Sequence, residues 1–295
     1  MRIACTAAVM MLGALLPRPT QAQMTATERL LEAKDLMRKQ GVPCEVASCT
    51  ELALRNLKAL IAAHPEAPEV PFAKYLSGVC LIRFGRYDEA AGIFEEALRG
   101  PVDSRGRENI LWHLAFAYFR SLDYVKAKRA YETFLEEFPQ SRHADEAKKL
   151  LAPLKMVGAK AQMFKATDIN GQELDLKAYA GKPLLLHFWA TWCPPCRGEL
   201  PNLKKAYDRF HEKELQFVGV SLDTDAAKLA EYLRTHGVSW PHYCDGKKWN
   251  SPLAKVYNVN SIPIIFLIDR RGVIRYTDIR GEATFRAIET LLKGE

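Results

Sequence analysis

Ten residues decide how this chain of 295 residues folds: Phe188-Trp189-Ala190-Thr191-Trp192-Cys193-Pro194-Pro195-Cys196-Arg197. The apolar run at 184–190 predicts a fully buried strand, and residues 197–210 carry apolar side chains at helical spacing. Cys193 should therefore stand at the start of a helix, where free backbone N–H groups and the helix dipole stabilise a thiolate. Cys196 should lie one turn further in, close enough to form a disulfide with Cys193. Pro195 suits this first turn because its missing N–H costs nothing there.

Two cysteines separated by two residues also occur in zinc sites, in haem attachment sites and in structural disulfides. Residue 197 is Arg, so the haem signature Cys-x-x-Cys-His is absent. No second Cys-x-x-Cys lies nearby to complete a zinc site. The pair is therefore interpreted as redox-active, and neither a metal nor an organic cofactor is expected.

The residues around the two cysteines resemble the thioredoxin superfamily, and within it the TlpA/ResA group of extracytoplasmic thiol-disulfide oxidoreductases. The resemblance covers about half of the chain. It rests on 188–196, Glu199-Leu200-Pro201, Gly219-Val220-Ser221-Leu222-Asp223, Val259-Asn260-Ser261-Ile262-Pro263, Phe266-Leu267-Ile268-Asp269 and Gly272.

This resemblance implies an α/β thioredoxin fold over residues 161–295. Cys193 would be the attacking nucleophile and Cys196 the resolving thiol. The Ile262–Pro263 peptide would be cis and face the cysteines, which leaves the backbone before it free to pair with an extended substrate. The residues expected to contact substrate surround these two points: Trp192, Pro194, Pro195, Ile262 and Pro263.

Two polar residues near the cysteines bear on the mechanism. His187 stands six residues before Cys193, where thioredoxin has a buried Asp, and the simplest interpretation is a hydrogen-bonded core histidine. Glu199 stands three residues after Cys196, where ResA-like proteins also have Glu. By this resemblance Glu199 takes the proton of Cys196 during exchange. The alternative is an exposed glutamate that favours the helix dipole.

The first 22 residues have the pattern of a secretory signal peptide. Met1-Arg2 is followed by an apolar stretch at 3–16 and by the small-residue site Thr20-Gln21-Ala22. A retained membrane anchor is the alternative, although the apolar run is short for a membrane span. The mature protein is thus expected to be soluble in an oxidising compartment, most simply the bacterial periplasm.

Residues 23–152 have a helical pattern that repeats. Ala53, Ala90 and Ala127 are each 37 positions apart, and Pro65, Val102 and Pro139 keep the same step. This spacing resembles the tetratricopeptide repeat, lengthened by inter-repeat linkers. Stacked repeats usually form a concave face, so a docking platform for a protein partner is weighed against a simple spacer. Residues 153–160 are expected to link the repeats to the thioredoxin-like domain.

Cys44 and Cys49 flank four residues that are expected to form a turn between the first two helices. In an oxidising compartment this spacing favours a small structural disulfide over two free thiols or a second redox pair.

The sequence as a whole predicts a two-domain protein: an all-α, tetratricopeptide-like repeat followed by an α/β thioredoxin fold. Its expected function is thiol-disulfide exchange with protein substrates, and the resemblance implies a reductive direction, with electrons from a membrane thiol relay. A peroxiredoxin-like peroxidase would need Pro-x-x-x-Thr-x-x-Cys, which is absent, and a non-enzymatic repeat adaptor is the other alternative. The net charge is +7, but the sequence has no run of basic residues interleaved with aromatic ones, so no nucleic-acid partner is expected.

Overall fold

The computed structural model describes residues 24–38, 43–213 and 215–294, without the side chains of residues 38–48. The predicted signal peptide at 1–22 lies outside the described residues. The chain divides into two compact units, and the boundary between them falls between Ile110 and Leu111. The boundary expected at 153–160 stays a prediction.

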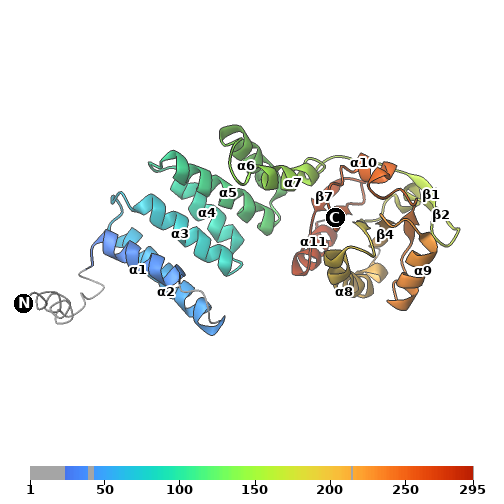
Figure 1. Cartoon of the computed structure of the whole chain (residues 1–295), viewed down its shortest axis with the longest axis horizontal. Helices are drawn as coiled ribbons and strands as arrows, with labels where there is room; N and C mark the ends of the chain where they lie inside the picture. Colours follow the sequence, from blue (N-terminus) through green and yellow to red (C-terminus); the bar gives the residue numbers. More distant parts are fainter. Residues whose placement is uncertain (1–23, 39–42, 214, 295) are drawn as a thin grey trace, which may run out of the picture. The chain divides into compact units, whose positions relative to one another are not determined.

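The first unit is helical. It holds α1 (Ala26–Arg38), α2 (Pro43–Ala63), α3 (Val70–Arg83), α4 (Tyr87–Leu98) and the start of α5 (Ser104–Ser121). Helix α2 packs against both α1 and α3, and α3 packs against α4, as the blue to cyan ribbons show (Figure 1). This is the antiparallel stacking that the repeated spacing predicts.

Close approach of α3 and α4 depends on one glycine. A Cβ on Gly78 would meet the ring of Phe94, fully buried on α4, at 2.4 Å. Gly78 on the first helix of this repeat therefore makes room for an aromatic ring on the second.

The second unit contains the sheet. In chain order its elements are the end of α5, α6 (Tyr124–Glu137), α7 (Ala144–Leu154), β1 (Lys165–Thr167), β2 (Glu173–Asp175), η3 (Leu176–Tyr179), β3 (Leu184–Trp189), α8 (Pro194–Phe210), η4 (His211–Lys213), β4 (Gln216–Ser221), α9 (Ala226–Thr235), β5 (His242–Cys244), η5 (Lys248–Asn250), α10 (Pro252–Val256), β6 (Ile264–Ile268), β7 (Ile274–Thr277) and α11 (Glu282–Lys293).

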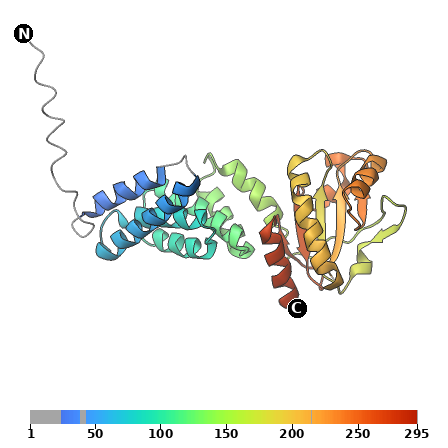
Figure 2. The same ribbon diagram turned by 90° about the horizontal axis from the view of Figure 1, so that it is seen from below.

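Five of these strands form one mixed sheet in the order β5-β4-β3-β6-β7. Strand β3 is central, parallel to β4 and antiparallel to β6, while β1 and β2 form a separate antiparallel hairpin. The yellow to red ribbons show the strands with helices packed around them (Figure 2). The α/β thioredoxin fold expected from the sequence is confirmed.

Strand β3 is buried along its whole length because it lies between two packed faces. Phe188 points to one face, where its ring contacts Tyr257 and Phe266. On the opposite face, which includes His187 and Trp189, α8 packs on the sheet through the ring contact of Tyr207 with Phe217. Among the described residues, no helix has both the length and the apolar character needed to cross a bilayer.

Candidate active site

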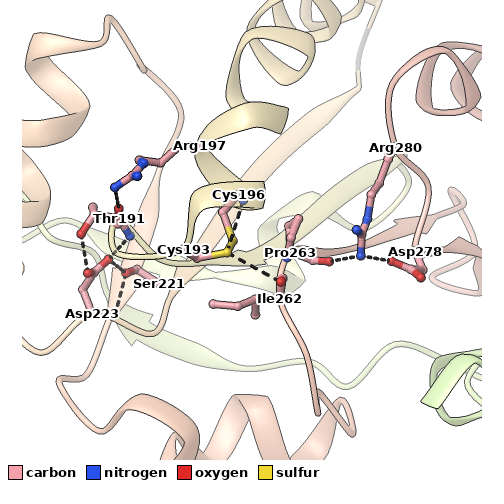
Figure 3. The surroundings of a disulfide bond; sticks show 10 residues. All are labelled: Thr191, Cys193, Cys196, Arg197, Ser221, Asp223, Ile262, Pro263, Asp278 and Arg280. Atoms are coloured by element: carbon pink, nitrogen blue, oxygen red, sulfur yellow. Dashed lines mark hydrogen bonds and ion pairs between the residues drawn. A yellow bond between two sulfur atoms is a disulfide. The ribbon is translucent and has the colours of Figure 1, made fainter. Parts of the chain in front are cut away.

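The two cysteines lie at the junction of β3 and α8, and they are joined by a disulfide. The Cα atoms of Cys193 and Cys196 are 5.3 Å apart. Cys193 is the N-cap residue of α8, and its Sγ accepts a hydrogen bond from the backbone N–H of Cys196 at 3.2 Å (Figure 3). Cys193 is 4 % exposed, whereas Cys196 is fully buried. Cys193 is therefore the more accessible of the two cysteines.

The two prolines limit how well the helix start can stabilise a thiolate. Pro194 and Pro195 occupy the first two helical positions and have no N–H to donate. The amide of Cys196 is the next along the chain, and it already points at Sγ of Cys193. A thiolate on Cys193 thus gains one short backbone hydrogen bond where a helix start without prolines could offer more.

A loop that ends in a cis proline faces the disulfide. The Ile262–Pro263 peptide is cis, as the resemblance implies, and Sγ of Cys193 lies 3.6 Å from the carbonyl oxygen of Ile262. The guanidinium of Arg280 donates to the carbonyl of Pro263 at 3.0 Å and to the carboxylate of Asp278 at 2.8 Å (Figure 3). Sequence reasoning missed Arg280, which only the fold brings to this loop.

The loop between β3 and α8 is held by a buried aspartate. The carboxylate of Asp223 accepts from the backbone N–H of Thr191 at 2.9 Å, from its hydroxyl at 2.6 Å and from the hydroxyl of Ser221 at 2.6 Å. Arg197 adds a bond to the carbonyl of Thr191 at 3.2 Å. Ser221 and Asp223 belong to the segments that carried the family resemblance, but no role was predicted for them. Their hydrogen bonds hold the loop that leads from β3 to Cys193.

Glu199 lies in the second turn of α8 and is buried, with 7 % of its surface exposed. One carboxylate oxygen accepts from the backbone N–H of Gly281 at 2.8 Å and the other from the amide of Asn202 at 3.2 Å. The exposed glutamate considered as an alternative is therefore wrong. Glu199 ties α8 to the start of α11, and its role in proton transfer stays a prediction.

His187 is buried and shares a row of the sheet with Gly219 and His242. Neither ring nitrogen of His187 has a hydrogen-bond partner within the described residues, in contrast to the hydrogen-bonded histidine that was expected. Burial, with the nearby His242 and Arg280 adding to it, lowers the pKa of His187 to about 3. Burial also lowers the pKa of His242 to about 4. Both imidazoles are neutral at physiological pH.

The residues expected to contact substrate surround the disulfide. Trp192, Pro194 and Pro195 are exposed on the helix side, and Ile262 is half-buried on the opposite loop. Trp192 contacts a second exposed indole, Trp249 of η5, which the sequence did not single out.

The remaining cysteines lie elsewhere. Helix α2 begins at Pro43, so Cys44 and Cys49 are within this helix and not in the turn that was expected. The side chain of Cys44 lies outside the described residues, so the disulfide between Cys44 and Cys49 stays a prediction. Burial raises the pKa of Cys80 to about 11, as befits an inert thiol. The half-buried Cys244 donates from Sγ to the carbonyl of Asp223 at 3.2 Å.

Within the described ranges, no group of three or more His, Cys, Asp and Glu side chains is placed to hold an ion.

Comparison with known proteins matches both parts of the chain. The sequence profile of the AhpC/TSA family matches residues 157–277, and tetratricopeptide repeat profiles match 50–104 and 110–141. The thiol-disulfide oxidoreductase ResA of Bacillus thuringiensis subsp. konkukian is 31% identical over 137 residues, which are 46% of this chain and 77% of that protein. The chain belongs to the ResA family of thiol-disulfide oxidoreductases.

Further proteins are similar to the same part of this ResA-family oxidoreductase. ResA of Bacillus anthracis is 32% identical over 138 residues, again 46% of this chain and 77% of the relative. The thioredoxin domain of a thiol-disulfide oxidoreductase from Bacteroides vulgatus is 26% identical, with a TM-score of 0.44, over 46% of this chain and 97% of that structure. The family assignment favours thiol-disulfide exchange over the peroxidase and adaptor alternatives. The tetratricopeptide profile matches confirm the predicted repeats, and the AhpC/TSA and ResA matches confirm the predicted thioredoxin fold.

Proposed function

We propose that this oxidoreductase reduces disulfides of protein substrates in the periplasm, with Cys193 as nucleophile and Cys196 as resolving thiol. The thiolate of Cys193 attacks one sulfur of a substrate disulfide, forms a mixed disulfide and releases the other substrate sulfur as a thiolate. Cys196 then attacks Sγ of Cys193, which forms the internal disulfide and releases the second substrate thiol. Two electrons pass from the dithiol to the substrate.

The single observation that carries the reductive direction is the hydrogen bonding at Sγ of Cys193. Stabilising the thiolate favours the dithiol form and makes a disulfide more oxidising. Here Pro194 and Pro195 withhold two backbone donors, and Sγ receives one hydrogen bond from the amide of Cys196. The dithiol is therefore stabilised less than at a helix start with three donors, and it gives up its electrons more readily.

Glu199 is proposed as the group that accepts the proton of Cys196. It follows Cys196 by three residues on α8 and is buried, so water competes little for the proton. Its hydrogen bond from Gly281 holds one oxygen in place. The second oxygen accepts only a longer bond, from Asn202, and is the better candidate for proton transfer.

The place in the cell and the electron donor belong to the same proposal. Support for export comes from the signal-like pattern at 1–22 and from the family's disulfide chemistry, which fits an oxidising compartment. A reductase there needs a source of electrons, and a membrane thiol relay could regenerate the dithiol by the same exchange reaction.

The test is to trap the mixed disulfide. The variant Cys196→Ala lacks the resolving thiol, so covalent adducts with natural substrates should accumulate on Cys193. The double variant Cys193→Ala/Cys196→Ala is the matched control and should form none. Adducts released by a reductant and identified by mass spectrometry give the substrates. Equal adduct formation in both variants would disprove the assignment of Cys193.

We further propose that the helical repeats dock a protein partner. A pocket of about 300 Å³ lies within the first unit, and Phe72 on its wall is 39 % exposed. In the Cys196→Ala trap, Phe72→Ala should reduce capture of a docked substrate severalfold by lowering its effective concentration at Cys193. Phe84→Ala, which removes a ring that is 38 % exposed, is the control. Unchanged capture by both variants would favour the spacer role.

A further inference from the structure

Two of the five tryptophans of this chain are exposed, and they contact one another beside the disulfide. Trp192 is 46 % and Trp249 is 43 % exposed, and their ring centroids are 6.4 Å apart in an edge-to-face arrangement. The other three are buried: Trp112, Trp189 and Trp240. Exposed indole surface is uncommon because tryptophan buries more apolar area than most residues. A pair of exposed indoles next to a nucleophile therefore indicates a surface that is covered in use.

The loop that carries Trp249 is held in one conformation. The carboxylate of Asp245 accepts from the backbone N–H of Lys247 at 2.9 Å. Lys248 has a φ of +50°, a value that residues other than glycine rarely adopt. Gly246 has a φ of +72°, and a Cβ there would lie 3.2 Å from the carbonyl oxygen of Thr224. Backbone strain directly before Trp249 is consistent with a loop shaped for a task.

The segments that lead to the two indoles are hydrogen-bonded to the same buried residue, Asp223. The carboxylate of Asp223 holds Thr191, which directly precedes Trp192. The backbone carbonyl of Asp223 accepts from Sγ of Cys244, at the start of the loop that leads to Trp249. The backbone segments that carry the two indoles are therefore both tied to Asp223, which limits the conformational entropy lost when a ligand covers them.

We propose that Trp192 and Trp249 form a binding surface for a large apolar side chain next to the cysteine that Cys193 attacks. The occupant is an extended segment of a substrate protein with an aromatic or long aliphatic residue adjacent to its disulfide. Trp192 is bonded to Cys193, and neighbouring residues of an extended chain are about 3.3 Å apart along its axis. A side chain adjacent to the attacked cysteine is thus within reach of the indoles.

The charge around the pair restricts the occupant further. Lys247 and Lys248 are exposed, and neither ammonium group is in a salt bridge within the described part of the chain. Asp245 is the acidic side chain of the same loop, and it is half-buried. A substrate segment without basic residues beyond its apolar side chain fits this rim best.

This proposal rests on the proposed function, and two peptides test it. Each carries one cysteine as a mixed disulfide with 5-thio-2-nitrobenzoate, and the residue before the cysteine is Phe in one and Ser in the other. The reduced wild-type protein should attack the Phe peptide about three to ten times faster, because an aromatic contact contributes that much. In Trp249→Ala the ratio of the two rates should fall below about twofold, and Trp249→Phe should retain most of it.

Val256→Ala is the matched control, since Val256 is 49 % exposed in the same domain, and its ratio should equal that of the wild type. The rate with glutathione disulfide, measured for every variant, reports whether exchange chemistry is intact. A wild type with equal rates for both peptides, or an undiminished ratio in Trp249→Ala, overturns the binding surface while exchange with glutathione disulfide continues. Loss of exchange with every disulfide in the wild type would instead refute the proposed function.

Discussion

The helical unit and the sheet each bury an aromatic ring directly over a glycine, and the two rings differ in polarity. In the helical unit Gly78 admits Phe94, whose ring would lie 2.4 Å from an added Cβ. In the sheet Gly219 admits His242, with a closest approach of 2.2 Å. Phe94 carries no polar atom, whereas Nε2 of His242 is buried without a hydrogen-bond partner in the described residues.

The core of the helical unit and the core around the sheet should therefore differ in how their stability depends on pH. Burying an unpaired nitrogen costs free energy, and the sheet does so at His187, Trp189 and His242. The helical unit buries the polar side chains of Arg29, Thr50, Asn56 and Ser77, but no histidine of its described residues is buried. Protonation should therefore affect the sheet much more than the helices, and four predictions test this contrast.

The largest effect is expected from filling the two glycine positions. Gly219→Ala should lower the free energy of unfolding by about 3 kcal/mol, because the ring of His242 is enclosed by Trp189 and Trp240 and cannot move aside. Gly78→Ala should cost a similar amount through Phe94. Urea titration measures both. The double variant Gly219→Ala/His242→Ala lacks the ring, so part of the stability lost in Gly219→Ala should be recovered. If the losses of the two single variants simply add, the methyl group added at position 219 does not clash with the ring of His242.

The second prediction compares a thiol from each region. With a pKa of about 11, Cys80 is thiolate to roughly one part in ten thousand at pH 7. Cys193, at a helix start and with its sulfur hydrogen-bonded to the amide of Cys196, should react with iodoacetamide at least about a hundredfold faster in the reduced protein. Cys196 should also react slowly because it is fully buried. Mass mapping of timed samples gives the rates, and comparable labelling of Cys193 and Cys196 would remove the basis for calling Cys193 the nucleophile.

The third prediction concerns acid. The folded-state pKa values of His187 and His242, about 3 and 4, lie below the unfolded value of about 6.5. Between these values the unfolded chain binds more protons, so the free energy of unfolding falls as the pH falls below about 6.5. Each histidine contributes up to about 1.4 kcal/mol per pH unit.

Unfolding curves between pH 4 and 7 measure this slope. His187→Leu should reduce the slope of unfolding free energy against pH by the contribution of one histidine. The control is His236→Asn, because His236 is exposed. A slope that His187→Leu leaves unchanged would show that this imidazole gains a partner on folding.

The smallest effect is expected from one added backbone donor. Pro195→Ala restores an N–H near Sγ of Cys193 and should stabilise the thiolate. The reduction potential of the Cys193–Cys196 pair should rise by about 30 mV, which corresponds to about 1.4 kcal/mol. Equilibration with glutathione measures it. The matched variant Pro201→Ala lies deeper in α8, beyond reach of Sγ, and a rise of equal size there would point to a helix effect unrelated to the sulfur.

The sequence predicted those features that depend on local pattern. The strand before Cys193 follows from an unbroken apolar run, and the start of the helix after it follows from two prolines that suit a first helical turn. Strand β5 could not be predicted, because its three residues are too few to show an alternation of apolar and polar side chains. Its pairing with β4 comes from the sheet and not from its own sequence.

The site was predictable to the same extent. The two cysteines and the cis proline follow from a motif, whereas Arg280 reaches Pro263, and Trp249 reaches Trp192, only through the fold. The burial of Glu199 also depends on tertiary packing, because the start of α11 covers it. A turn was expected at Cys44, but the helix already begins at Pro43, where a proline suits the first position.

The sulfur of Cys193 is surrounded by main-chain atoms, the amide of Cys196 and the carbonyl of Ile262. Main-chain groups persist when side chains are exchanged. The backbone groups that contact the reactive sulfur can therefore stay the same during evolution, while the exposed side chains around it change to suit new substrates. For protein engineering, this means that substrate choice can be redesigned at Trp249 without altering the backbone hydrogen bond at the reactive sulfur.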